Sequence, residues 1–195
     1  MPILPFLLYV FVMTFTPGPN NIMSMSNANR YGFKKTLRFI FGVSFGFLVI
    51  LLLSSYFNLL LYSIIPKVKL VMGILGSLYM VWLAYRIMMS SSGKKGADNE
   101  RLNSFLSGFG LQFINFKGIL YAITAFSSFV IPYYRSNGIL ILISAFMAIV
   151  FFSASLCWAG FGSLFQRFLS KYEKPFHIIM GLSLLFSAVS IYTEI

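Results

Sequence analysis

The chain has 195 residues, of which 58% are hydrophobic and 10% are charged. Soluble domains are typically about 45–50% apolar and about 25% charged, and a fold of this size leaves roughly 30% of its unfolded surface in water. The composition therefore excludes a water-soluble enzyme. The formal net charge is +11, but the basic residues lie between apolar blocks, whereas those of a nucleic-acid-binding protein cover one face of a soluble fold. The sequence predicts an integral membrane protein in a lipid bilayer, with no nucleic-acid partner.

Six apolar stretches are long enough to cross the hydrocarbon core as helices, which takes about 20 residues each. In chain order they cover residues 3–26, 39–65, 70–89, 105–131, 138–165 and 176–192. A polar linker rich in Gly and Ser, at about residues 90–103, separates the first three stretches from the last three and has a flexible composition. The sequence therefore predicts one all-α transmembrane domain over residues 1–195, with half-repeats at about 1–92 and 103–195.

The basic residues are distributed unevenly between the predicted loops. The loops after the first, third and fifth stretches hold eleven of the fifteen Lys and Arg, and the other side of the membrane receives three. The positive-inside rule places the eleven in the cytoplasm and both termini outside. Three spans followed by three more reverse the direction of the second half, which is the arrangement of an inverted repeat in secondary transporters.

The first span contains a run that a regular helix cannot accommodate. Each proline lacks an N–H group and clashes with the carbonyl one turn back, and in lipid the freed backbone groups need protein or water partners. The residues of the run are Thr16, Pro17, Gly18, Pro19, Asn20 and Asn21. We expect a helix break that forms part of a substrate site or a gate; the alternatives are a hairpin turn or a simple kink.

The fourth span contains Lys117, the one charged residue deep in any predicted span. Its insertion costs about 2.5–3.5 kcal/mol, so we expect its ammonium group in a wet cavity or against a partner; snorkelling is hard from mid-span. Tyr121 and Thr124 share its helical face, whereas Asn115 is about 200° away on an ideal helix. Either these residues serve two surfaces or the helix unwinds, and a break matching that of the first span favours unwinding.

The two interruptions together predict a binding site. Helix N-termini at a break attract carboxylates, and Lys117 adds a full positive charge. Amide and hydroxyl groups come from Thr16, Asn20, Asn21, Gln112 and Asn115. Because no Asp or Glu lies within a span, the site suits an anionic or zwitterionic solute. Cys157 is the only cysteine, and we predict no metal site and no cofactor.

These residues resemble those of the LysE/RhtB (lysine exporter / homoserine-threonine exporter) superfamily of bacterial amino-acid exporters. The hallmarks are Thr-Pro-Gly-Pro-Asn at residues 16–20 and Asn-Phe-Lys at residues 115–117. The cysteine/O-acetylserine exporter branch is the most similar, through residues 16–22, 111–117, 157–159 and 165–167. Many members have Pro between the Asn and the Lys; Phe116 departs from this, so a weaker break is expected in the fourth span.

The resemblance implies efflux of small neutral or zwitterionic amino acids or their derivatives across the bacterial inner (cytoplasmic) membrane, driven by the proton motive force. No intramembrane carboxylate is present to carry the proton. Lys117 is one candidate carrier, because desolvation favours its neutral form, and His177 is a poorer one. Whether the protein forms a homodimer stays open.

The sequence is compatible with three classes of function: an exporter, a passive channel and a membrane protein that does not transport. The leading one is a secondary exporter in which the two broken helices alternate access around Lys117. A passive channel needs a continuous polar lining, and the spans have few polar positions away from the breaks. An intramembrane enzyme usually needs a constellation of His, Ser or acidic residues within the bilayer, and this chain has one His and no intramembrane acid. An assembly subunit is the other non-transport alternative.

Overall fold

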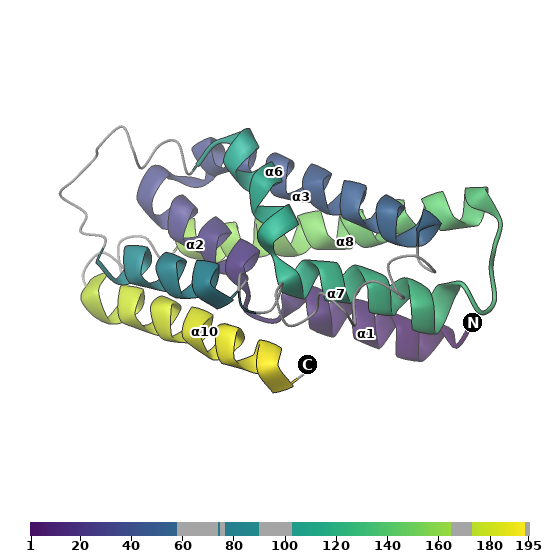
Figure 1. Cartoon of the computed structure of the whole chain (residues 1–195). Coiled ribbons are helices and arrows are strands. Elements are labelled where there is room, and N and C mark those ends of the chain that lie inside the picture. The colour runs from purple at the N-terminus through teal and green to yellow at the C-terminus, as the bar shows by residue number, and fades with distance from the viewer. Residues whose placement is uncertain (58–73, 75–76, 90–102, 165–172, 194–195) are drawn as a thin grey trace.

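The computed structural model describes residues 1–57, 74, 77–89, 103–164 and 173–193, and within them every regular element is a helix. The all-helical prediction is confirmed for this part of the chain. Residues 77–88 are also helical. The named elements (Figure 1) are α1 (Ile3–Phe15), α2 (Pro19–Tyr31), α3 (Phe33–Tyr56), α6 (Phe105–Ile114), α7 (Phe116–Thr124), the π-helix η1 (Ala125–Val130), α8 (Asn137–Leu164) and α10 (Glu173–Thr193).

Within the described residues, two helices can cross a membrane by length and apolar composition, or up to four spans exist if each bent pair is one span. α3 and α8 are each long enough alone, while α1 with α2, and α6 with α7 and η1, form two bent pairs. The sixth predicted stretch corresponds to α10, and the third lies partly outside the described residues. The arrangement of six spans as two inverted halves therefore stays a prediction.

The helices extend beyond the apolar stretches that predicted them. α2 continues to Tyr31, and α3 begins at Phe33 rather than at residue 39. The reason is that Lys and Arg are good helix formers, so the basic turns remain helical where the chain has become too polar for lipid. Gly32, with φ of 85°, joins α2 to α3 in a conformation that favours glycine.

Three glycines allow two helix pairs, α3 with α6 and α2 with α8, to approach closely. A Cβ atom added at Gly42 of α3 would overlap the carbonyl of Phe105 of α6, and one added at Gly108 of α6 would overlap the carbonyl of Phe39 of α3. Gly162 of α8 lies in the same way against the carbonyl of Met25 of α2. Small residues at such crossings are typical of membrane helices, because they bring the two backbones into contact.

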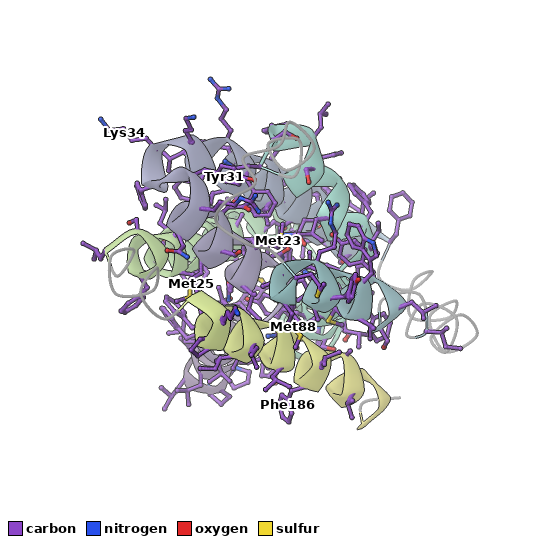
Figure 2. All side chains as sticks on the ribbon, turned by 90° about the vertical axis from the view of Figure 1, so that its left-hand side faces the viewer. Met23, Met25, Tyr31, Lys34, Met88 and Phe186 are labelled. Atoms are coloured by element: carbon purple, nitrogen blue, oxygen red, sulfur yellow. The ribbon has the colours of Figure 1, made fainter. Side chains whose placement is uncertain are left out.

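The bundle has two distinct ends. At one end, which we call the N-terminal end, lie the start of α1, the turn between η1 and α8, and the start of α8 (Figure 1). The opposite end, which we call the basic end, carries Arg30, Lys34, Lys35 and Arg38 around the turn between α2 and α3. Figure 2 looks onto the basic end, where Lys34 points away from the bundle.

Candidate functional site

The first break separates α1 from α2 by three residues and bends the pair by 45°. It is thus a bend in the chain direction and not a hairpin. Gly18 is extended, with φ of −168° and ψ of 174°, and its carbonyl accepts the first helical bond of α2 from the N–H of Ile22 at 3.0 Å. Pro19 occupies the first turn of α2, where its missing N–H costs nothing because first-turn amides have no intrahelical acceptor.

The second break is a single residue, Asn115, between α6 and α7, and it bends the chain by 65°. The side-chain oxygen of Asn115 accepts a hydrogen bond from the N–H of Gly118 at 3.3 Å and so caps α7. The chain bends sharply here although Phe116 stands where many superfamily members have proline. Because the helix restarts after Asn115, the 200° separation expected on a straight helix does not apply, and Asn115 and Lys117 reach the same cavity.

One cavity lies between the two breaks. Its volume of about 20 Å³ is room for a water molecule. Both α2 and α7 begin at this cavity, so the positive ends of two half-helices face it. The lining residues are Met13, Thr14, Thr16, Gly18, Pro19, Asn20, Asn21, Asn115, Lys117, Gly118, Tyr121 and Phe151.

Lys117 connects the two broken helices through its ammonium group. The Nζ atom donates to the hydroxyl of Thr16 at 2.9 Å, to the carbonyl of Thr16 at 3.3 Å and to the carbonyl of Pro17 at 3.1 Å. The Lys117 stem also passes Gly18 closely, since a Cβ atom there would lie 3.3 Å from Cδ and 3.4 Å from Nζ. These neutral oxygens solvate the charge without neutralising it.

Asn20 and Asn21 each use their amide nitrogen within the protein. Asn21 Nδ2 donates to the carbonyls of Thr14 at 2.8 Å and Thr16 at 3.0 Å, which the proline break leaves without helical partners. Asn20 Nδ2 donates to Gln112 Oε1 at 3.2 Å. The Oδ1 atoms of both asparagines are buried without a hydrogen-bond partner. Two acceptor atoms of cavity-lining residues are therefore unused.

Gln112 lies behind the cavity. Its Oε1 atom accepts from Asn20 and, at 3.3 Å, from Asn115, while its Nε2 atom donates to the carbonyl of Val43 at 3.0 Å. The Gln112 side chain is completely buried and is not among the lining residues. It joins both breaks to α3, a position that suits orienting the asparagines better than contacting a solute.

An aromatic cluster adjoins the cavity towards the N-terminal end. Tyr121 receives a hydrogen bond from Thr14 at 3.2 Å. Its ring lies 5.5 Å from Phe47 and 5.6 Å from Tyr9, and Phe47 lies 4.4 Å from Phe151. We use "aromatic cluster" for Tyr9, Phe47, Tyr121 and Phe151. These rings come from four helices and separate the cavity from the N-terminal end.

The structure brings most of the predicted site residues together. Three predicted residues do not line the cavity. Gln112 is behind it, Thr124 ends α7 one turn beyond Tyr121, and Pro17 contacts the site only through its carbonyl, which accepts from Lys117. Sequence reasoning missed four lining residues, Met13, Thr14, Gly118 and Phe151. No local pattern distinguishes these from ordinary span residues. The side chain of His177 lies outside the described residues.

The charge of the lining is wholly positive. Lys117 is the ionisable lining residue besides Tyr121, and no carboxylate is among the residues that surround the cavity. In the described part of the chain, no three His, Cys, Asp or Glu side chains group as metal ligands. An ammonium, two half-helix N-termini and two amide oxygens surround the cavity, and they offer donors to a carboxylate and acceptors to a neighbouring hydrogen-bond donor.

Comparison with known proteins then identifies the family. Residues 11–194 match the family model described as LysE type translocator. The chain belongs to the LysE type translocator family. As a translocator of this family it is a transporter rather than an enzyme, and the superfamily resemblance read from the sequence is confirmed.

Relatives of this LysE type translocator carry a specific name. It is 36% identical over 184 residues to the cysteine/O-acetylserine efflux proteins of Escherichia coli strain K12 and of Escherichia coli O157:H7, an alignment that covers 94% of this chain and 94% of each relative. No solved structure matches the chain.

Proposed function

We propose that this protein is a secondary-active exporter of small zwitterionic amino acids and their derivatives. The observation that carries the proposal is the meeting of Lys117, two half-helix N-termini and two unpaired asparagine oxygens around one cavity. The relatives named cysteine/O-acetylserine efflux proteins indicate cysteine and O-acetylserine as the first solutes to test. The membrane is then the bacterial inner membrane, with the basic end in the cytoplasm.

The substrate carboxylate binds at Lys117. At present the ammonium is held by the neutral oxygens of Thr16 and Pro17, and hydrogen bonds between two ionised groups are stronger than those to neutral acceptors. A carboxylate therefore displaces these contacts. The first-turn amides of α2 and α7 supply further donors to its oxygens.

The substrate amino group binds at the Oδ1 atoms of Asn20 and Asn21. Both atoms are buried acceptors without a hydrogen-bond partner in the protein, and an ammonium group supplies donors to match them. Amide oxygens bind an ammonium without adding a negative charge, so the site remains suited to solutes with no net charge. A second cationic group, as in lysine, has no acidic partner among the lining residues.

Transport requires the two breaks to move. The cavity of about 20 Å³ is too small for an amino acid, so it must widen before a solute can bind. The 45° and 65° breaks are the positions at which half-helices can rotate without breaking regular hydrogen bonds. Movement of α1 and α7 separates the aromatic cluster and opens the N-terminal end; movement of α2 opens the basic end.

Lys117 is one candidate proton carrier within this proposal. It contacts the first break, and its ammonium is the group whose charge the bound carboxylate compensates. Because the charged form binds the carboxylate, solute and proton bind at Lys117 together and cross in the same direction. Efflux driven by the inward proton gradient therefore needs a second group that carries a proton inward; His177 is the remaining candidate, and a homodimer remains to be tested.

The test is efflux from proteoliposomes that contain the purified protein and radiolabelled O-acetylserine or cysteine. We expect efflux that saturates with solute, exceeds that of protein-free liposomes and accelerates with an imposed proton gradient. Flux that rises linearly with solute supports a passive channel instead. Absence of flux above protein-free liposomes for both solutes contradicts the proposed substrates.

A further inference from the structure

Buried polar atoms without hydrogen-bond partners gather on one side of the site. Eight side-chain atoms of this kind occur in the described part of the chain. They belong to Asn20, Asn21, Ser24, Asn27, Asn29, Ser44, Asn103 and Ser155. All eight residues lie at the cavity or between it and the basic end, and none belongs to α1, α7 or η1, which lead to the N-terminal end.

Three of these residues form a stripe along α2. Asn20, Ser24 and Asn27 are spaced four and three residues apart, so they share one helical face. Their side chains are 4%, 0% and 6% exposed. We call them the α2 polar stripe. It starts at the cavity, where Asn20 is a lining residue, and runs one turn at a time towards the basic end.

Two serines on neighbouring helices continue the pattern. Phe47 of α3 and Phe151 of α8 touch at the cavity, with ring centroids 4.4 Å apart. α3 and α8 run in opposite directions (Figure 1), so Ser44, three residues before Phe47, and Ser155, four residues after Phe151, lie at the same depth. Both are one turn from the cavity on its basic side. The helices that enclose α2 thus also present unpaired hydroxyls.

Unpaired buried polar groups are costly in a membrane protein. Each costs about 1–3 kcal/mol relative to a satisfied group, and lipid provides no water to replace the missing partner. A helix with a packing role alone is expected to carry apolar side chains at these positions. Such groups are explained when the same face is hydrated in another state of the protein.

The ends of α2 allow it to move as a unit. Gly18 precedes the helix in an extended conformation, and Gly32 follows it with φ of 85°. No atom lies within 4 Å of the position that a Cβ atom would take at Gly32, so the chain has space to turn there. Hinge positions of this kind absorb changes of backbone angle while the helix between them stays intact.

We propose that the α2 polar stripe, with Ser44 and Ser155, lines the cytoplasmic access pathway to the site. Rotation of α2 about Gly18 and Gly32 opens the interface with α3 and α8, water enters along the stripe, and the solute follows it from the basic end to Asn20 and Lys117. This inference rests on the proposed function, because it assigns the route by which the exported solute reaches the site.

Cysteine accessibility tests the pathway. Cys157 is the only cysteine in the chain, so Cys157→Ser provides a thiol-free parent. Ser24→Cys and Asn27→Cys place single thiols on the stripe, and Ile22→Cys is the matched control, because Ile22 is 0% exposed and lies on the opposite face of α2. Each protein is treated with a charged, membrane-impermeant methanethiosulfonate in inside-out vesicles and in right-side-out vesicles.

We expect Ser24→Cys and Asn27→Cys to be modified several-fold faster than Ile22→Cys, and only from the side that carries the basic end. Saturating O-acetylserine is expected to change the rate for Ser24→Cys and not for Ile22→Cys. Modification of the stripe residues no faster than of Ile22→Cys, or equally from both sides, contradicts the pathway.

Efflux measured in parallel separates this inference from the proposed function. If the Cys157→Ser parent exports no solute while the stripe thiols are modified as expected, the proposed substrates are contradicted and the pathway stands. If the parent exports solute and the stripe thiols are as protected as Ile22→Cys, the pathway alone is contradicted.

Ser24→Ala gives a second readout that does not depend on tolerance of cysteine. The Ser24 hydroxyl has no partner to lose, so we expect an equal or higher midpoint of thermal unfolding together with slower efflux per folded protein. A lower midpoint with unchanged efflux indicates a purely structural serine and overturns the assignment.

Discussion

The ammonium group of Lys117 donates to neutral oxygens of the first break. They are the hydroxyl and carbonyl of Thr16 and the carbonyl of Pro17. A buried ion pair with an acid would hold the ammonium in place and compete with a solute. Neutral acceptors leave the charge able to bind a carboxylate, and they link occupancy of the site to the geometry of the first break.

Gln112 supports the site from behind, and its replacement tests that role. In Gln112→Leu, the carbonyl of Val43 and the amide groups of Asn20 and Asn115 lose their partner while remaining buried. We expect the free energy of unfolding to fall by about 1–3 kcal/mol, measured by thermal unfolding in detergent. Ile114→Leu, on the exposed face of the same helix, is the control; equal stability of the two variants would contradict the role.

Part of the site could be predicted from residue types alone. The Pro and Gly run of the first span cannot remain helical, and a lysine in mid-span needs a polar environment, so both features have local physical causes. The roles of Gln112 and Phe151 could not be predicted, because they depend on which helices meet. The unused oxygens of Asn20 and Asn21 depend on hydrogen bonds that form only in the folded bundle.

At the level of helices, the two halves of the first span differ in character. α1 is strongly apolar and leaves large side chains such as Leu4, Leu8 and Val12 exposed towards lipid. α2 is polar, yet eight of its thirteen residues are buried. A polar helix enclosed by apolar ones is explained by a solute pathway better than by packing.

Two glycines in α6 test the contact between α6 and α3. A Cβ atom at Gly108 would overlap the Phe39 carbonyl and lie 2.9 Å from the Val43 nitrogen. A Cβ atom at Gly110 would have no neighbouring atom within 4 Å. We expect Gly108→Ala to lower the free energy of unfolding by about 1–3 kcal/mol through overpacking. Gly110→Ala is expected to raise it by about 0.5–1 kcal/mol, because alanine favours the helix.

Thermal unfolding of both alanine variants in the same detergent provides the comparison. A Gly108→Ala protein as stable as the Gly110→Ala protein would show that α6 and α3 do not pack as closely as the structure describes.

The residues at which helices begin and end were the hardest features to predict from the sequence. Hydropathy locates the part of a helix that fits in lipid, and it therefore misses the basic first turns of α3. The break at Asn115 was predicted because Asn115 and Lys117 lie on opposite sides of an ideal helix and can reach one site only if the helix unwinds between them. The π-helix at Ala125–Val130 has no glycine or proline that predicts it; it depends on how α7 packs within the bundle.

For the whole molecule, the basic residues distinguish the two ends of the bundle. Arg30, Lys34, Lys35 and Arg38 surround the turn that follows α2, and the unpaired polar atoms lead from the site towards the same end. The basic residues that the positive-inside rule uses and the proposed access pathway thus lie at the same end of the bundle.

Topology is tested with single thiols in the Cys157→Ser protein. Lys34 is exposed at the basic end, and Tyr133 is 56% exposed in the turn between η1 and α8. Because positive loops remain in the cytoplasm, we expect Lys34→Cys to react with an impermeant reagent only in inside-out vesicles and Tyr133→Cys only in intact cells. The reverse pattern would place the access pathway on the outer side.

The most direct test of the substrate site is O-acetylserine efflux from proteoliposomes containing wild-type, Lys117→Arg or Lys117→Met protein. Loss of a charge-assisted hydrogen bond costs about 1.5–3 kcal/mol, so we expect Lys117→Met to lower the apparent affinity about 10- to 100-fold. Lys117→Arg is expected to retain part of it. The account further predicts that the methyl ester of the substrate, which lacks the carboxylate, competes poorly in wild type. Efflux by Lys117→Met with wild-type affinity, and equal competition by the methyl ester, would contradict a carboxylate site at Lys117.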